Sequence, residues 1–196
     1  MPILLLVGLG NHQAICPPKG MTSYIIVPPD PNWPRLASEE ITAIASTLNI
    51  DPKQIEHVGS TAVPGLGAKL IIDLMLGIPD FDSSQNNQQY LAPLKQIGYE
   101  FDGTETTPGT YYIRKAGPPR FNLHMTKYGG SFWLDHLLFR DYLRSHPDAV
   151  RQYEVLKVSL LDRLGPDPDK QAYNEGKSAF INGILDIARK EGASII

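Results

Sequence analysis

Cysteine and net charge are the two things that this 196-residue sequence has least of. Its single cysteine, Cys16, excludes an internal disulfide and a cysteine-cluster metal site, and we expect a reducing, cytoplasmic environment. A formal net charge of -3 supplies no basic field, so we expect no nucleic-acid partner. The apolar N-terminal stretch MPILLLVGLG is too short to span a bilayer and lacks a basic flank, so we expect no membrane partner.

What is present fits one globular domain, since 42% of the residues are hydrophobic. We expect an N-terminal extension over residues 1–20 and a single domain over residues 21–192. Strands and helices mix up to about residue 128, and residues 131–190 are helical in pattern. This order predicts an α/β or α+β fold, a mixed β-sheet with flanking helices and a C-terminal helical layer.

Apolar runs and alternation predict the strands, and a spacing of three and four residues predicts the helices. The expected strands cover residues 54–59, 70–78, 110–116 and 120–127, and a further one lies in TSYIIVPP, residues 22–29. The expected helices cover residues 34–48, 82–98, 131–145, 147–164 and 168–190. The linker GPP predicts a hairpin between the last two strands, and strands 54–59, 70–78 and 120–127 are expected in one sheet.

The most informative segment is residues 56–76, EHVGSTAVPGLGAKLIIDLML. It is no Walker phosphate loop, because the lysine of that loop directly follows glycine, whereas Lys69 follows alanine. Gly59 and Ser60 instead offer backbone N–H groups and a hydroxyl to phosphate oxygens, with Lys69 in reach of the phosphate. Asp73, on the next strand, is placed to hold a metal. The alternative is a tight turn capped by Ser60, with Asp73 hydrogen-bonded in the core.

This segment, together with LLFRDYLRSHPDAVRQYEVLK and AYNEGKSAFI, resembles the GrpB family, small bacterial proteins assigned to the polymerase-β-like nucleotidyltransferase superfamily. The stretch IIVPPDPNWPRLASEE resembles the N-terminal segment of the same family. The likeness runs from about Tyr24 to Ala188. It implies a nucleotidyltransferase-like fold, in which a Gly-Ser turn is followed by acid-apolar-acid on a strand.

Position 75 departs from that pattern. Residues i and i+2 of a strand share a face, so the partner of Asp73 is Met75, which is no useful ligand for magnesium. The superfamily usually adds an acid from a later strand, where this chain offers Asn122 and His124. These donors predict at most a weakly bound divalent metal, Mg²⁺ or Mn²⁺, held by Asp73 and His124, or a ligand bound without metal.

Basic side chains elsewhere are candidates for holding a small anionic or nucleotide ligand. Four of them are arginines on strands or on one helical ridge, for which surface salt bridges and a solvated helix face are the alternatives. These arginines are Arg114, Arg120, Arg140 and Arg144. Lys177 lies on the inward stripe of the last helix, with Tyr173 one turn away to stack or hydrogen-bond. We expect Lys177 to point into a polar site, and the alternative is a lysine that lays its stem along the core.

Three functions compete for this set of residues. Met75 in place of the second carboxylate favours a protein that binds a nucleotide or another small anion without turnover. The alternative is an active metal-dependent nucleotidyl- or phosphoryl-group transferase, with Asp73 and His124 at the metal and Lys177 neutralising developing charge. A third is acid–base chemistry on a small molecule by His124 with Asp73.

Overall fold

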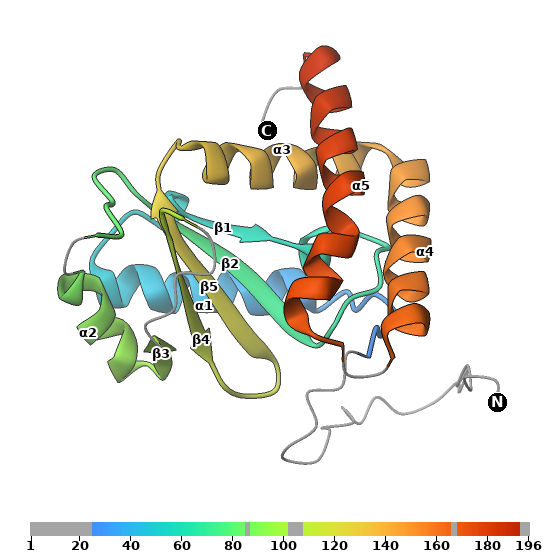
Figure 1. The fold of residues 1–196 in the computed structure, drawn as a ribbon. Coiled ribbons are helices and arrows are strands. Elements are labelled where there is room, and N and C mark those ends of the chain that lie inside the picture. Colours follow the sequence, from blue (N-terminus) through green and yellow to red (C-terminus); the bar gives the residue numbers. More distant parts are fainter. Residues whose placement is uncertain (1–24, 85–86, 102–107, 166–167, 193–196) are drawn as a thin grey trace.

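The computed structural model describes residues 25–84, 87–101, 108–165 and 168–192. The extension expected over residues 1–20 lies outside them. The helices are α1 (Trp33–Leu48), α2 (Gln88–Gln96), α3 (Ser131–Ser145), α4 (Pro147–Leu164) and α5 (Lys170–Lys190), as labelled in Figure 1. The strands are β1 (Ile55–Val58), β2 (Ile71–Ile78), β3 (Tyr99–Phe101), β4 (Thr110–Lys115) and β5 (Arg120–Lys127). Two short 3-10 helices, η1 (Pro52–Gln54) and η2 (Ser60–Ala62), flank β1.

The five strands form one sheet in the order β1-β2-β5-β4-β3. Only β2 and β5 run parallel, and the other neighbours are antiparallel, so the sheet is mixed as predicted. Strands 54–59, 70–78 and 120–127 were expected in one sheet, and β1, β2 and β5 confirm it. The hairpin expected across GPP is also confirmed, by the antiparallel pairing of β4 with β5.

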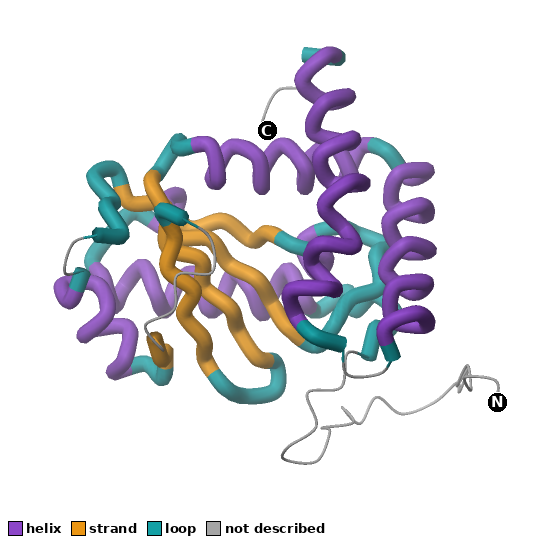
Figure 2. Tube along the Cα trace, in the orientation of Figure 1, coloured by secondary structure: helices purple, strands orange, loops and turns teal. Residues whose placement is uncertain are grey.

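The helices lie on the two sides of this sheet (Figure 2). On one side α1 and α2 cover the apolar side chains of alternate strand positions, such as Leu74 and Leu123, which are fully buried there. On the other side lie α3, α4 and α5, which form their own apolar cluster with the loop after η2. The C-terminal helical layer is therefore confirmed, and it faces the strand positions that carry Asp73 and Met75.

Local signals set the ends of these elements. Pro34 lies in the first turn of α1, where its missing N–H costs nothing, and Asn49 ends the helix in the left-handed conformation with φ 53°. Pro147 likewise opens α4, as predicted. Two expectations were wrong in extent. The helix expected over residues 82–98 begins only at Gln88, and the strand expected over residues 22–29 amounts, in its described part, to a single bridge between Val27 and Ala68.

Within the described ranges, every helix is too short or too polar to cross a membrane.

Candidate functional site

A glycine at the end of β1 sets the geometry of the candidate site. Gly59 has φ 74° and ψ -170°, a backbone conformation that only glycine adopts readily. A β-carbon at this position would lie 2.8 Å from Oδ2 of Asp73. The absent side chain thus lets the turn into η2, where Ser60 begins, come directly against the carboxylate of β2.

Asp73 lies on β2 among polar groups from β5, on the same face of the sheet. The amide of Asn122 donates a 2.6 Å hydrogen bond to Oδ1 of Asp73, and the register pairs these two residues. Nε2 of His124 lies 4.0 Å from the same oxygen. The expectation that Asp73, Asn122 and His124 share one face is therefore confirmed. The ring of His124 also packs near Tyr112 and Phe132, with centroids 5.1 and 5.9 Å away.

The donors around Asp73 do not fit a two-metal centre. Met75 shares the Asp73 face but is fully buried in an apolar cluster with Val58, Trp133 and Leu137. The thioether is thus part of the core and does not line the carboxylate. Oδ1 of Asp73 already accepts from Asn122, and among the described residues no group of three His, Cys, Asp or Glu side chains could hold a metal ion. Mg²⁺ requires near-octahedral oxygen coordination, which one carboxylate does not provide.

Lys157 of α4 contacts Ser60. Its side chain is only 3% exposed, its ammonium lies 3.3 Å from Oγ of Ser60, and it also donates to the carbonyl oxygen of Gly67. Burial, together with the charge of Lys177 and against the opposing charge of Glu154, lowers the pKa of Lys157 to about 8. We call Gly59, Ser60, Asp73 and Lys157 the Ser60 site.

Two more lysines gather around one aromatic ring beside this site. The ammonium groups of Lys69 and Lys177 lie 4.4 and 4.6 Å from the ring centroid of Tyr173, which is buried. The predicted inward stripe of α5 is therefore confirmed. Burial, and then the charges of Tyr173 and Asp73, raise the pKa of Tyr153, which places these groups in one electrostatic neighbourhood. We call Lys69, Lys157 and Lys177 the lysine cluster.

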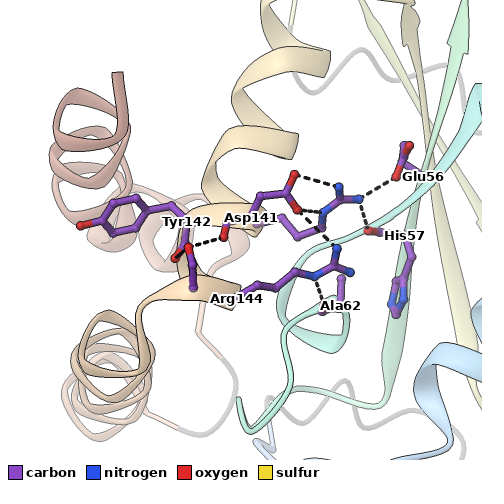
Figure 3. Close-up of polar contacts among 8 residues, drawn as sticks. Glu56, His57, Ala62, Asp141, Tyr142 and Arg144 are labelled. Carbon is purple, nitrogen blue, oxygen red and sulfur yellow. Dashed lines mark hydrogen bonds and ion pairs between the residues drawn. The ribbon is translucent and has the colours of Figure 1, made fainter. Parts of the chain in front are cut away.

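The two arginines of α3, which we expected to contact a ligand, contact protein groups. Arg140 is buried and donates to Oε2 of Glu56 at 2.6 Å, to the carbonyl of His57 at 3.1 Å, and to both oxygens of Asp141 (Figure 3). Hydrogen bonds to Asp141 and Glu56 raise the pKa of Arg140 against the lowering effect of burial. This guanidinium therefore holds β1 in place.

Arg144 continues the same network on the far side of the turn. Its Nε donates to the carbonyl oxygen of Ala62 at 2.9 Å and its Nη1 to Asp141 at 3.3 Å (Figure 3). Asp141 thus lies between the two arginines and joins them into one clamp, which grips the chain before and after Ser60. We call Glu56, Arg140, Asp141 and Arg144 the arginine clamp. Its hydrogen bonds to protein acceptors on both sides of the turn position the turn.

Behind this turn lies His57, whose Nε2 is joined to Oγ1 of Thr61 by a 2.9 Å hydrogen bond. Burial, followed by the charges of Arg144 and Arg140, lowers the pKa of His57 to about 4. A neutral imidazole is therefore part of the support under η2.

The two remaining arginine candidates lie at the Asn122 side of the sheet. Arg114 of β4 is the register partner of Asn122, and its guanidinium lies 5.0 Å from the ring centroid of Tyr112. Arg120 begins β5, two residues before Asn122 and hence on the same face. Both arginines are on the polar face that carries Asp73.

Two cavities lie beside the turn. One, of about 280 Å³, is walled by prolines and Trp33 together with residues 61–65, and the other, of about 220 Å³, lies between Pro64 and the start of α4. Neither is lined by Ser60 or Asp73. They flank the back of the turn, so the polar chemistry and these apolar hollows are separate features.

Sequence reasoning missed Lys157 and the arginine clamp. Lys157 falls at helical spacing with Val150, Tyr153 and Leu160, all buried. A lysine within the apolar stripe of a helix is the same signal that singles out Lys177, and it was available in the sequence. The clamp leaves no such signal, because it depends on which helix packs over β1.

Known proteins are similar to this chain over most of its length. The family model described as GrpB protein matches residues 23–186. A UPF0157 protein of Pseudomonas aeruginosa is 37% identical over 165 residues, which cover 82% of this chain and 65% of that protein. This chain therefore spans just under two thirds of that relative's length.

Two solved structures are also similar. The crystal structure of conserved protein GrpB from Enterococcus faecalis superposes with a TM-score of 0.71 at 31% identity, over 87% of this chain and 100% of that one. A cytoplasmic RNA terminal U-transferase is a more distant match, with a TM-score of 0.45 and 15% identity over 71% of this chain and 41% of that one. The family match and the first structure define the relationship of this chain.

Proposed function

The chain belongs to the GrpB family, and we propose that its Ser60 site binds a nucleotide or another small phosphorylated anion without transferring a nucleotidyl group. The observation that carries the proposal is a buried ammonium, Lys157, directed at the hydroxyl of Ser60. Burying an ammonium costs free energy unless charge or hydrogen bonds compensate. A bound phosphate would supply both, and the hydroxyl of Ser60 would donate to it.

The glycine turn supports this reading. The positive φ of Gly59 turns the chain from β1 into η2 and so brings Ser60, the first residue of η2, to Lys157. The arginine clamp fixes that backbone from behind, so the site is preorganised before a ligand arrives. Preorganisation matters here because an exposed loop would have to be ordered at the expense of binding free energy.

The absence of transfer follows from the donor set at Asp73. A two-metal mechanism needs carboxylates that clamp the attacking and leaving oxygens together. Met75 is buried against Trp133 and Leu137, so position 75 offers neither a carboxylate ligand nor an open coordination position to a metal. The side chains at this site therefore do not fit a two-metal mechanism.

The direct test is equilibrium binding of AMP, ADP and ATP by calorimetric titration. Ser60→Ala is expected to weaken binding of the best ligand at least fivefold, and Lys157→Met at least tenfold. Ser159→Ala is the matched control, because Ser159 is exposed on α4 and bonds only within that helix. Equal affinities for all four proteins, or no binding of any phosphorylated ligand, would overturn the proposal.

A second candidate rests on the pair formed by Asp73 and His124, which lie 4.0 Å apart on a polar face. An imidazole beside a carboxylate can move a proton on a bound small molecule. Phosphorus NMR of ATP or GTP incubated with the protein tests it. A product made by the wild type and not by His124→Gln would favour this candidate, whereas unchanged nucleotide supports binding alone.

A further inference from the structure

Helix α4 carries two stripes of side chains on opposite sides. Its inward stripe is buried and consists of Val150, Tyr153, Lys157 and Leu160. The stripe on the other side has a similar helical spacing and is exposed. We call it the outer stripe, and it consists of Arg151, Val155, Val158 and Asp162. In Figure 1, α4 forms one side of the helical layer, next to α5.

The two valines in the middle of the outer stripe add little to the core. Val155 is 69% exposed and Val158 is 45% exposed. A β-branched side chain loses rotamer freedom in a helix, so valine is a poorer helix former at a solvent-facing position than lysine or glutamate. A single exposed apolar residue is ordinary on a protein surface. Two of them one turn apart, with an opposite charge at each end of their stripe, form a patch that a matching surface can cover.

The order of the charges makes the outer stripe complementary to a second copy of itself. Arg151 lies one turn before Val155, and Asp162 lies one turn after Val158, so the stripe is positive, apolar, apolar and negative in turn. In an antiparallel pair of such helices, with a two-fold axis through the middle of the stripe, Arg151 lies opposite Asp162 of the second copy. Val155 then lies opposite Val158. A parallel pair would place Arg151 opposite Arg151, which like charges oppose.

We propose that α4 binds α4 of a second copy of this chain through the outer stripe, in an antiparallel dimer with two-fold symmetry. The same patch on both copies forms the contact, with one charge pair at each end and the valines of both copies between them. The inward stripe, which carries Lys157, is not part of the contact. The proposal therefore goes beyond the proposed function and does not depend on it.

The size of this contact sets its strength. The outer stripe runs from Arg151 to Asp162, which is about 16 Å of helix at about 1.5 Å per residue. Stable, specific interfaces usually bury about 1,200–2,000 Å² in total, with roughly 20–30 residues a side, so one short helix pair is small. We expect a weak, reversible dimer with a dissociation constant on the order of 100 µM. Arg151 also pairs with Asp148 within α4, but that pair is exposed and contributes little to stability, so it does not prevent a contact with Asp162.

The test is sedimentation velocity of the full chain at concentrations from 5 to 500 µM. The sedimentation coefficient of the wild type should rise with concentration from that of a monomer toward that of a dimer. Arg151→Glu and Asp162→Arg should each weaken dimerisation at least tenfold, because either one places like charges at both ends of the contact. The variant with both substitutions has opposite charges again, in reversed order, and should dimerise within threefold of the wild type. Val155→Glu should stay monomeric at 500 µM.

A charge reversal away from α4 is the matched control. Lys53 is exposed in η1, and Lys53→Glu changes the net charge as much as Arg151→Glu does, so it should leave dimerisation within twofold of the wild type. Circular dichroism spectra that match the wild type show that each variant is folded.

Three results would overturn the proposal. The first is a wild type that stays monomeric at 500 µM. The second is a dimer that Arg151→Glu, Asp162→Arg and Val155→Glu leave unchanged, because the copies would then associate through another surface. The third is a doubly substituted variant that dimerises no better than the single ones, because Arg151 and Asp162 would then not face each other. Nucleotide binding is tested separately by Ser60→Ala and Lys157→Met, so failure of the dimer leaves the proposed function standing.

Discussion

Replacing Lys157 by methionine isolates the free energy that the buried ammonium costs the folded protein. Methionine keeps the length and the apolar stem of lysine and removes the charge. In the folded chain burial lowers the pKa of Lys157 from its usual 10.5 to about 8. The unfolded chain therefore binds this proton more tightly, and it holds more protons than the folded chain between pH 8 and pH 10.5. Stability of the wild type accordingly rises with pH across this window, relative to a variant without the amine.

The magnitude follows from that shift. One pKa unit corresponds to about 1.4 kcal/mol, so the full cost near pH 7 is about 3 kcal/mol, of which about 2 to 3 kcal/mol disappears by pH 10. The hydrogen bonds that Lys157 makes to Gly67 and Ser60 offset part of the cost at pH 7. The variant loses these hydrogen bonds at every pH. The informative quantity is therefore how the difference in free energy of unfolding between the two proteins changes with pH.

The assay is urea unfolding of the wild type and Lys157→Met at pH 7, 8, 9 and 10, with Lys53→Met as the control. Subtracting one protein from the other cancels the titration of all other groups. Between pH 7 and pH 10, the free energy of unfolding of the wild type should rise by about 2 to 3 kcal/mol relative to that of Lys157→Met. A difference that stays constant within about 0.5 kcal/mol would show that the ammonium is not desolvated, and it would remove the energetic basis of the proposed anion site.

Three further predictions concern the turn and its supports. Gly59→Ala should lower the free energy of unfolding by about 1–3 kcal/mol in urea unfolding, because the backbone at this position suits only glycine and a β-carbon would press on Asp73. Gly65→Ala is the control and should lower it less, because φ is positive there too but the β-carbon would meet nothing within 4 Å. Asp141→Asn should lower the free energy of unfolding by about 3 kcal/mol, since it leaves the buried Arg140 without the carboxylate of Asp141. Asp148→Asn, in an exposed ion pair, should change it by less than about 0.5 kcal/mol. Equal effects of the two substitutions would refute the arginine clamp. The imidazole resonances of His57 should stay flat between pH 5.5 and 8, because its pKa is about 4 in the folded chain, and the stability that its neutral form contributes should be lost as pH falls from about 6.5 toward 4.

The fold was predictable where periodicity is long. Helices α3 and α4 and strand β5 have the predicted bounds, since each carries an apolar pattern over eight or more residues and is opened or closed by glycine, proline or a hairpin. β3 spans only Tyr99–Phe101, too few residues for any pattern to stand out. The strand expected over residues 22–29 reads as apolar and β-branched, but its described part pairs with the chain only at Val27, next to a run of prolines that cannot extend a ladder.

The site was predictable to the extent that it follows from strand alternation. Placing Asp73, Asn122 and His124 on one face needs only a period of two and a shared sheet, both of which the sequence contains. Alternation also puts Met75 on that face, but it cannot tell an open position from one covered by Trp133. Which cation reaches Ser60, and which arginine stays behind the turn, depends on how the helical layer docks, and no local pattern encodes that.

The arginine clamp and Lys157 tie the geometry of the turn to helices that lie far from it in the sequence. Arg140, Arg144 and Lys157 reach back across 82 to 97 residues to Glu56, Ala62 and Ser60. The geometry of the Gly-Ser turn therefore depends partly on helices that follow the sheet strands in the sequence. The turn has its full set of contacts only when α3 and α4 are packed over it. A chain interrupted before α4 would keep Ser60 and Asp73 and yet lack Lys157, the cation that contacts Ser60.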